Sequence, residues 1–252
     1  MDDPSPLSVE QLIRSVAAGA SDDAATTLRR FEAAAPADRK DAVRAVRDLA
    51  AEQPKAVGAV LPAVTAFLTD DERSIRLTTA KLFVAVAREA PSTVVPCIEA
   101  LTDRLADEAE FYYVRARSAE ALGYVALEHP DEVASPELLA DLQVGLSFDE
   151  AEVREKLAKA MAYVALGNPG RLRHQVDSIA EQLDDENELV RYHLCTTLAV
   201  VGCAFPDALA DATPALAARL DDESPYVRGR AAEAVGLLAD VDRSDLFTVI
   251  AA

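Results

Sequence analysis

The sequence predicts an all-α fold: a right-handed α-α superhelix, or α-solenoid, of about six helical hairpins. Three observations predict it. A phrase made of acidic residues, Val-Arg or Ile-Arg and then an alanine-rich stretch recurs along the chain. The stretch after each arginine has the 3.6-residue apolar period of an amphipathic helix. No segment alternates apolar and polar residues in the way that a half-buried strand would.

The repeat is anchored by an arginine that recurs at intervals of 39, 39, 37 and 37 residues: Arg76, Arg115, Arg154, Arg191 and Arg228. A proline follows each of the first four at an offset of 15 residues: Pro91, Pro130, Pro169 and Pro206. A step of 37 residues back from Arg76 reaches Arg39, and Pro54 follows it at the same offset. The register therefore extends into a segment that lacks the obvious phrase.

The elements are expected in the following order. Residues 1–20 hold a cap helix at 8–18, residues 21–240 form one array of repeats, and residues 241–252 form a short cap or tail. In each repeat, one helix runs from Val-Arg to the proline, and the last of these spans 225–239. Each proline stops that helix or opens the next one. Apolar stretches at 54–68, 91–105 and 206–220 then form the other helices, and acidic turns cap the helices that follow.

The unit resembles the HEAT repeat, a family of helical-hairpin solenoids, over about residues 21–240. The turn aspartates, the arginines and small-residue runs such as AAEAVGLLA (231–239) carry the resemblance. It implies a ladder in which turn aspartates pair with the arginines of neighbouring repeats. The ladder residues would be Asp70, Arg76, Asp107, Arg115, Asp149, Arg154, Asp184, Arg191, Asp221 and Arg228. The two 39-residue intervals place extra residues in the turns at 106–115 and 147–154, where the geometry stays open.

The chain is strongly acidic, with 44 aspartates and glutamates against 25 lysines and arginines and a net charge of −19. Five lysines against twenty arginines resemble the composition of proteins from salt-loving archaea; the alternative is an ordinary acidic protein. Such a surface repels nucleic acid and anionic membranes in bulk. The acidic N-terminus is no signal peptide, and no apolar run approaches the roughly 20 residues of a membrane span. A soluble, reduced, cytoplasmic protein is expected.

Catalytic, cofactor and metal sites are not predicted. His129, His174 and His193 fall at unrelated offsets, and the nine glycines form no phosphate loop. HEAT-like hydroxylases use His-Glu pairs and HEAT-like glycosylases use tryptophan, and this chain has neither feature. A lyase-like HEAT enzyme remains a remote alternative. Cys97, Cys195 and Cys203 fit no disulfide or metal spacing and are expected as small core residues.

The predicted site is a stripe on the helices that begin with Val-Arg, which line the concave surface in HEAT arrays. Offsets of 2, 5 and 9 residues from the arginine share one helical face. The basic and aromatic residues of this stripe are Lys81, Arg117, Tyr124, Lys156, Lys159, Tyr163, His193 and Arg230. The alternative is that these bases only balance Glu120, Glu155 and Glu233.

The predicted function is a non-enzymatic scaffold or adaptor that binds a protein partner through the concave groove. The stripe favours an acidic or phosphorylated segment of that partner, because arginine and aromatic residues are typical of interaction hot spots. A nucleic-acid binder is the alternative, since nucleic acid would seek the same bases, and a membrane partner is not expected. The identity of the partner and the oligomeric state are not indicated by the sequence.

Overall fold

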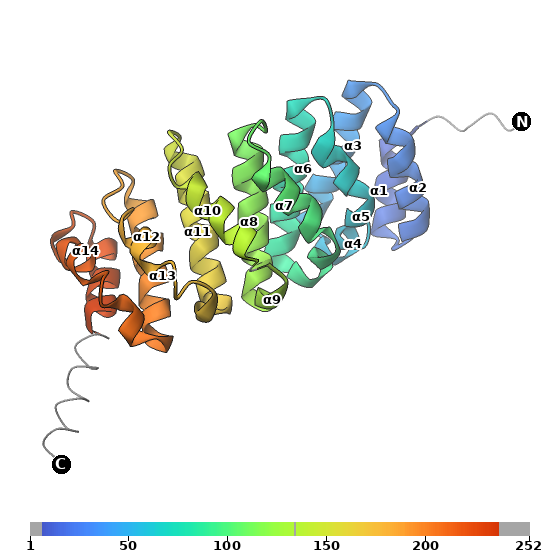
Figure 1. The fold of residues 1–252 in the computed structure, drawn as a ribbon. Helices are drawn as coiled ribbons and strands as arrows, with labels where there is room; N and C mark the ends of the chain where they lie inside the picture. The colour runs from blue at the N-terminus through green and yellow to red at the C-terminus, as the bar shows by residue number, and fades with distance from the viewer. Residues whose placement is uncertain (1–6, 134, 237–252) are drawn as a thin grey trace, which may run out of the picture. The chain divides into compact units, whose positions relative to one another are not determined.

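A computed structural model describes residues 7–133 and 135–236. This part of the chain is built from α-helices and short 3-10 helices without a β-strand, and it is an α-solenoid of stacked hairpins, as predicted (Figure 1). It divides into two compact units, Met1–Glu128 and His129–Ala252. The predicted tail at 241–252, and the end of the predicted helix at 225–239, lie outside the described residues.

The first unit begins with α1 (Val9–Ala17), close to the predicted helix at 8–18. The hydroxyl of Ser8 accepts a hydrogen bond from the Gln11 N–H at 3.3 Å and caps the helix. Three long helices, each beginning near a repeat arginine, pack in sequence: α3 (Pro36–Ala50) on α6 (Arg73–Glu89), and α6 on α8 (Tyr112–Glu128). The other elements are α2 (Ser21–Glu32), α4 (Pro54–Gly58), α5 (Leu61–Val64), η1 (Thr65–Thr69), η2 (Pro91–Thr93), η3 (Val95–Cys97) and α7 (Ile98–Ala106).

The second unit repeats this plan. Its long helices are α11 (Ala151–Gly167), α13 (Glu188–Ala204) and the helix at 225–236, and α11 packs on α13. We call the long helices of both units the second helices. The other elements are α9 (Pro130–Val133), α10 (Pro136–Gly145), η4 (Pro169–Arg171), α12 (Val176–Ala180), η5 (Pro206–Leu209), α14 (Thr213–Ala218) and η6 (Arg219–Asp221). Of these, α10 packs on α11 and α12 packs on α13.

The three segments at 54–68, 91–105 and 206–220, each predicted as one continuous helix, are broken in the structure. The first of these segments splits into α4, α5 and η1, and the others split in the same way. Each contains an internal proline, which are Pro62, Pro96 and Pro214. Proline has no N–H to donate, and its ring collides with the carbonyl four residues earlier, so a continuous helix cannot pass through it.

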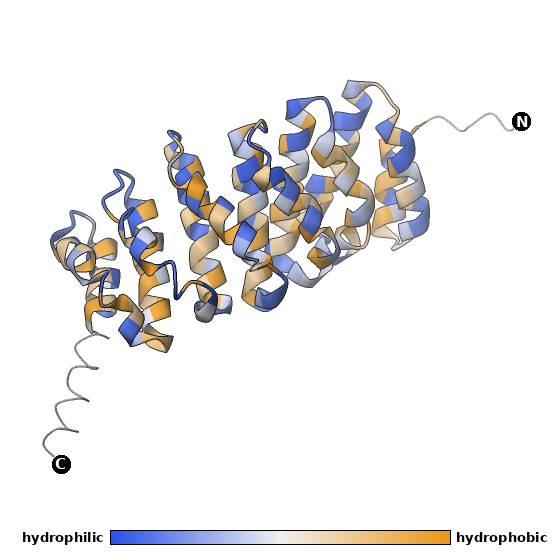
Figure 2. Cartoon of the chain, in the orientation of Figure 1, coloured by the Kyte–Doolittle hydropathy of each residue, from blue (hydrophilic) through white to orange (hydrophobic). Residues whose placement is uncertain are grey.

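The core lies between the helices of each unit. Figure 2 shows hydrophobic and hydrophilic residues interspersed along the helices, as expected for helices with one buried face. On the second helices the fully buried side chains include Phe83 and Leu198. The helices of one hairpin approach closely at Gly145, where a Cβ would displace a terminal methyl group of Leu157. Cys97 and Cys195 are buried as expected, whereas Cys203 is exposed, which corrects that part of the prediction.

Several repeat arginines link two turns, because each donates hydrogen bonds to carbonyls of its own turn and to a carboxylate of the next turn. In the clearest case, the Nη1 of Arg191 donates to the carbonyls of Asp185 and Glu186 in its own turn, at 2.7 and 3.1 Å. Its Nε and Nη2 donate to both carboxylate oxygens of Asp222 in the next turn, at 2.8 and 2.9 Å. Both side chains are almost fully buried, with 6% and 3% of their surface exposed.

The same contact recurs along both units. Arg39 pairs with Asp70 at 2.7 Å, Arg76 with Glu110 at 2.8 Å, and Arg154 with Asp185 at 2.7 Å. Arg115 donates to the carbonyl of Leu105 at 2.7 Å, and Arg228 donates to the carbonyl of Asp222, also at 2.7 Å.

Three of the predicted acidic partners are corrected. Asp185 and Asp222 replace the predicted Asp184 and Asp221, which are exposed. The acid at this position stands six residues before its own repeat arginine, and its carboxylate also accepts the N–H two residues later, as Asp222 does from Ser224. This second bond holds the carboxylate toward the preceding repeat.

In the longer turn at 106–115, Glu110 takes the place predicted for Asp107. The extra residues move Glu110 to within reach of Arg76, whereas Asp107 accepts a hydrogen bond from Arg104 at 3.2 Å. Asp107 also accepts the N–H of Ala109 and so stabilises the turn itself. Asp149 contacts its own repeat arginine through its backbone: the Nη1 of Arg154 donates a hydrogen bond to the Asp149 carbonyl at 2.8 Å.

Candidate binding site on the second helices

The predicted stripe is distributed over both units. Lys81 is exposed on α6, and Arg117 and Tyr124 are partly buried on α8, all in the first unit. The remaining members lie in the second unit, on α11 (Lys156, Lys159, Tyr163), on α13 (His193) and on the helix at 225–236 (Arg230). Within that unit, the ammonium group of Lys159 lies 5.4 Å from the centre of the Tyr163 ring.

Three bases of the stripe contact glutamates on their own helices. Arg117 pairs with Glu120, Lys156 with Glu155, and Arg230 with Glu233, each at 2.7 Å. These contacts are the ones expected if the bases of the stripe serve to balance the charges of Glu120, Glu155 and Glu233. A base that already contacts a carboxylate offers less attraction to an acidic partner, because that partner must compete with the existing pair.

His193 contributes no positive charge at neutral pH. Burial is the largest cause that lowers the pKa of His193, to about 4, and the positive charge of Lys159 lowers it further. Glu155 acts in the opposite direction, and Lys156 adds to the lowering. The imidazole ring also stands against the ring of Tyr192, with 5.3 Å between the ring centres. His193 is therefore a neutral, partly buried side chain of this surface.

This lowered pKa predicts a pH-dependent stability. Above pH 6.5, His193 is neutral in both the folded and the unfolded chain. Between pH 6.5 and about 4, the unfolded chain binds a proton that the folded chain does not, so stability falls as the pH falls. We expect the wild type to lose about 1 kcal/mol more than His193→Gln between pH 7.5 and pH 5.5, measured by urea unfolding. Parallel pH profiles for the two proteins would contradict this assignment.

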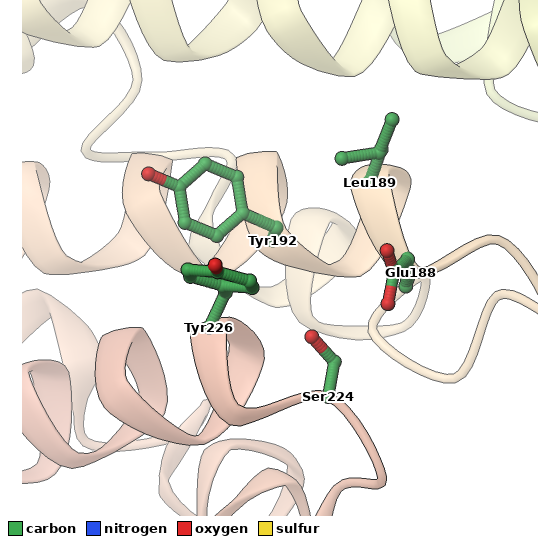
Figure 3. A pocket seen from close by; sticks show the side chains of 5 residues that line it. All are labelled: Glu188, Leu189, Tyr192, Ser224 and Tyr226. Atoms are coloured by element: carbon green, nitrogen blue, oxygen red, sulfur yellow. The ribbon is translucent and has the colours of Figure 1, made fainter.

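A pocket of about 220 Å³ opens between the second helices of the last two described repeats. Its lining residues come from α13 and from the start of the helix at 225–236: Glu188, Leu189, Tyr192, Ser224 and Tyr226. We call it the tyrosine pocket. Figure 3 shows the rings of Tyr192 and Tyr226 on one side of it and Glu188 and Leu189 on the other. Tyr226 is 73% exposed and Leu189 is 42% exposed, so two large side chains with apolar surface stand next to each other at the mouth of the pocket.

Arg230 holds Tyr192 from the side of the next helix. Its guanidinium lies 5.6 Å from the centre of the Tyr192 ring, and its Nη2 donates to the Tyr192 hydroxyl at 3.4 Å. Hydrogen bonds to Tyr192 and Glu233 raise the pKa of Arg230. This contact joins neighbouring repeats and fixes the edge of the tyrosine pocket.

The sequence-based reasoning missed the tyrosine pocket, although a signal for it exists. The stripe begins two residues after the repeat arginine. The residue two positions before that arginine lies about one helical turn earlier and is on the same helical face. In the last two repeats this position holds Leu189 and Tyr226, and the residue after Arg191 is Tyr192. Extending the stripe by one turn toward the acidic turns would have found Leu189 and Tyr226, and Tyr192 stands beside the repeat arginine.

A more open, acidic cavity of about 530 Å³ lies at the turns of the same repeats. It is lined by Ala218 and by charged residues, which are Asp184, Asp185, Glu186, Arg191, Arg219, Asp221, Asp222 and Glu223. Within residues 7–133 and 135–236, no group of histidines, cysteines and acids is arranged to hold a metal ion. In the same part of the chain, no helix is both long and apolar enough to cross a bilayer.

Comparison with known proteins agrees with this fold. Residues 176–251 match the family of HEAT repeats. A computationally designed armadillo repeat protein for modular peptide recognition is 18% identical, with a TM-score of 0.70 over 91% of this chain and 99% of that one. A designed armadillo repeat protein in complex with the peptide (KR)4 is 18% identical, with a TM-score of 0.64 and the same coverage.

A third similar structure, an engineered protein, is 20% identical and has a TM-score of 0.72, covering 94% of this chain and 99% of that one. No curated protein matches the chain. The class that the fold and these likenesses define is the α-solenoid of the HEAT and armadillo type.

Proposed function

We propose that this protein is a non-enzymatic scaffold that binds an extended segment of another protein along the exposed face of its second helices. The observation that carries the proposal is the tyrosine pocket, where large apolar side chains stay exposed on this face. Apolar patches with a polar rim mark interaction sites. Repeat arrays act mainly through such extended surfaces, so one pocket between two repeats is a natural anchor point.

The structural neighbours support this kind of partner. Two of them are designed armadillo repeat proteins made for peptide recognition or bound to a peptide. Stacked second helices present a periodic row of side chains, and an extended peptide has a period that can follow such a row. The neighbours support only the kind of partner, a protein segment. The position of the binding face is inferred from the second helices of this chain.

The predicted acidic or phosphorylated partner stays a prediction, and the contacts weigh against it. Arg117, Lys156 and Arg230 each contact a glutamate, and His193 is neutral at pH 7. The predicted concave groove would join residues of both units, whereas the tyrosine pocket lies within one unit. The binding function is therefore best tested at the tyrosine pocket.

The test is a selection of binding peptides from a random twelve-residue display library against the purified full chain. We expect enriched peptides whose binding falls at least about fivefold in the double variant Leu189→Ala/Tyr226→Ala. The matched control is Leu166→Ala/Asp211→Asn, which changes an exposed leucine and an exposed acid away from the tyrosine pocket. Circular dichroism establishes that both variants keep their helices.

Two outcomes contradict the proposal. A selection that enriches no peptide above background would remove the support for segment binding. Peptides that bind equally to the wild type, the pocket variant and the control variant would place the binding surface outside the tyrosine pocket.

A further inference from the structure

The tyrosine pocket has the size of one side chain. Its volume of about 220 Å³ is below the roughly 300–1,000 Å³ of sites that enclose a small-molecule ligand. It opens between two second helices, so a segment that crosses them can place one long side chain inside. This inference rests on the proposed function, because the occupant belongs to a bound protein segment.

The lining combines aromatic faces, an aliphatic side chain and one carboxylate. Tyr192 and Tyr226 supply ring faces and Leu189 supplies apolar surface, and among the described residues that line the pocket Glu188 alone is charged. Figure 3 shows these side chains around the same space, with the hydroxyl of Ser224 beside it. A cation over an aromatic face is attracted by the ring, and an aliphatic stem gains from contact with leucine and tyrosine.

The charges around the tyrosine pocket favour a basic occupant. The nearby base, Arg230, already contacts Glu233, and it occupies a face of Tyr192 at 5.6 Å, which shows that this ring accommodates a guanidinium. The turns beside the pocket expose Glu186 and Glu223, whose side chains are 82% and 85% exposed. The whole chain has a net charge of −19, so long-range attraction acts in the same direction.

This combination is not repeated at the equivalent positions of α11 and α6. At the equivalent positions on α11, Glu152 and Glu155 stand where α13 has Leu189 and Tyr192. On α6 the equivalent residues are Ser74 and Leu77. The aromatic and acidic lining is therefore a local feature and does not follow from the repeat itself.

We propose that the tyrosine pocket receives a lysine or arginine side chain of the bound protein segment. Its stem would pack on Leu189 and the tyrosine rings, and its charged head would face Glu188. The occupant would thus be basic, in contrast to the acidic or phosphorylated segment that the stripe predicts.

The test is an NMR titration of the full chain with N-acetyl-arginine N-methylamide as the probe. N-acetyl-citrulline N-methylamide, which has nearly the same shape without the charge, is the matched probe. We expect saturable shifts of the Leu189, Tyr192 and Tyr226 signals with the arginine probe, and about tenfold weaker binding of the citrulline probe. Glu188→Gln should weaken the arginine probe about three- to fivefold. Asp211→Asn, which removes an equal charge at an exposed position outside the tyrosine pocket, should leave it unchanged.

Equal binding of the two probes would overturn the inference, because the pocket would then select shape and not charge. The same conclusion follows if Glu188→Gln and Asp211→Asn weaken the arginine probe equally, since general attraction to an acidic surface would explain both. Library peptides that bind while the arginine probe causes no shift at these residues would refute the basic occupant and leave the proposed function standing. An arginine probe that binds while the library yields no peptide would support the pocket chemistry and refute segment binding.

Discussion

Arg191→Ala is expected to lower the free energy of unfolding by about 2–4 kcal/mol, because it leaves the carboxylate of Asp222 buried without its main partner. Only 3% of the Asp222 side chain is exposed, so the carboxylate of the folded wild type depends on the guanidinium more than on water. The substitution also removes the bonds from Arg191 to two carbonyls of its own turn. The loss should be measured by urea unfolding at pH 7.

Two further variants separate the causes of this loss. Arg230→Ala removes a more exposed pair with Glu233 and should cost no more than about 1 kcal/mol. Arg191→Ala/Asp222→Ala removes both buried partners and should recover part of the loss, because no buried charge remains. A cost below about 0.5 kcal/mol for Arg191→Ala would show that the buried pair is not structural.

The pH dependence of the same pair has a defined sign. Burial acts to raise the pKa of Asp222, but the hydrogen bonds from Arg191 and the Ser224 N–H outweigh it, and the pKa lies below its ordinary value. The pair therefore stabilises the fold above the ordinary aspartate pKa of about 3.9, and this contribution is lost as the pH falls through the lowered value. In Arg191→Ala, Asp222 loses its main counter-ion, so the penalty should shrink once mildly acidic solution protonates it.

Salt should stabilise the wild type strongly. Raising KCl from 0.1 M to 2 M shortens the Debye length from about 10 Å to below 3 Å and weakens repulsion among exposed carboxylates. The acidic cavity brings six carboxylates together with the two arginines Arg191 and Arg219. We expect the thermal midpoint to rise by about 10 °C or more, since the buried pairs are screened far less than the exposed acids.

A pair of substitutions tests the local source of this effect. Asp184→Asn/Asp221→Asn removes two exposed acids at the cavity that do not pair with the repeat arginines, so it should raise the midpoint at 0.1 M KCl and flatten the salt dependence. Glu137→Gln/Asp211→Asn removes the same charge from exposed positions elsewhere in the unit and should do less. A wild-type midpoint that is equal at low and high KCl would contradict the halophilic interpretation and favour an ordinary acidic protein.

The fold was predictable because its signals are periodic. Arginine and proline at fixed offsets define each second helix, and the apolar period along it specifies which face is buried. The broken first helices were also readable in principle, since Pro62, Pro96 and Pro214 stand inside the predicted segments. The division into units at Glu128 has no comparable mark in the sequence.

The candidate site was less predictable because its chemistry depends on contacts that spacing does not determine. Two adjacent acids, such as Asp221 and Asp222, look equivalent in the sequence, and only the turn decides which one faces Arg191. In the same way, offsets place Arg230 on an accessible face but do not show that it contacts Glu233 and Tyr192. Side-chain pairing across repeats is a tertiary property, and it determines which charges remain available to a partner.

We infer that the second helices, and not the shorter first helices of the hairpins, bind the protein segment. Hydrogen–deuterium exchange of the full chain, with and without a peptide selected from the library, tests it most directly. We expect slower exchange in the first turn of α13 and at residues 224–230, beside the tyrosine pocket, with no change in α10, α12 or α14. Protection of α10, α12 or α14, with the start of α13 and residues 224–230 unchanged, would contradict it.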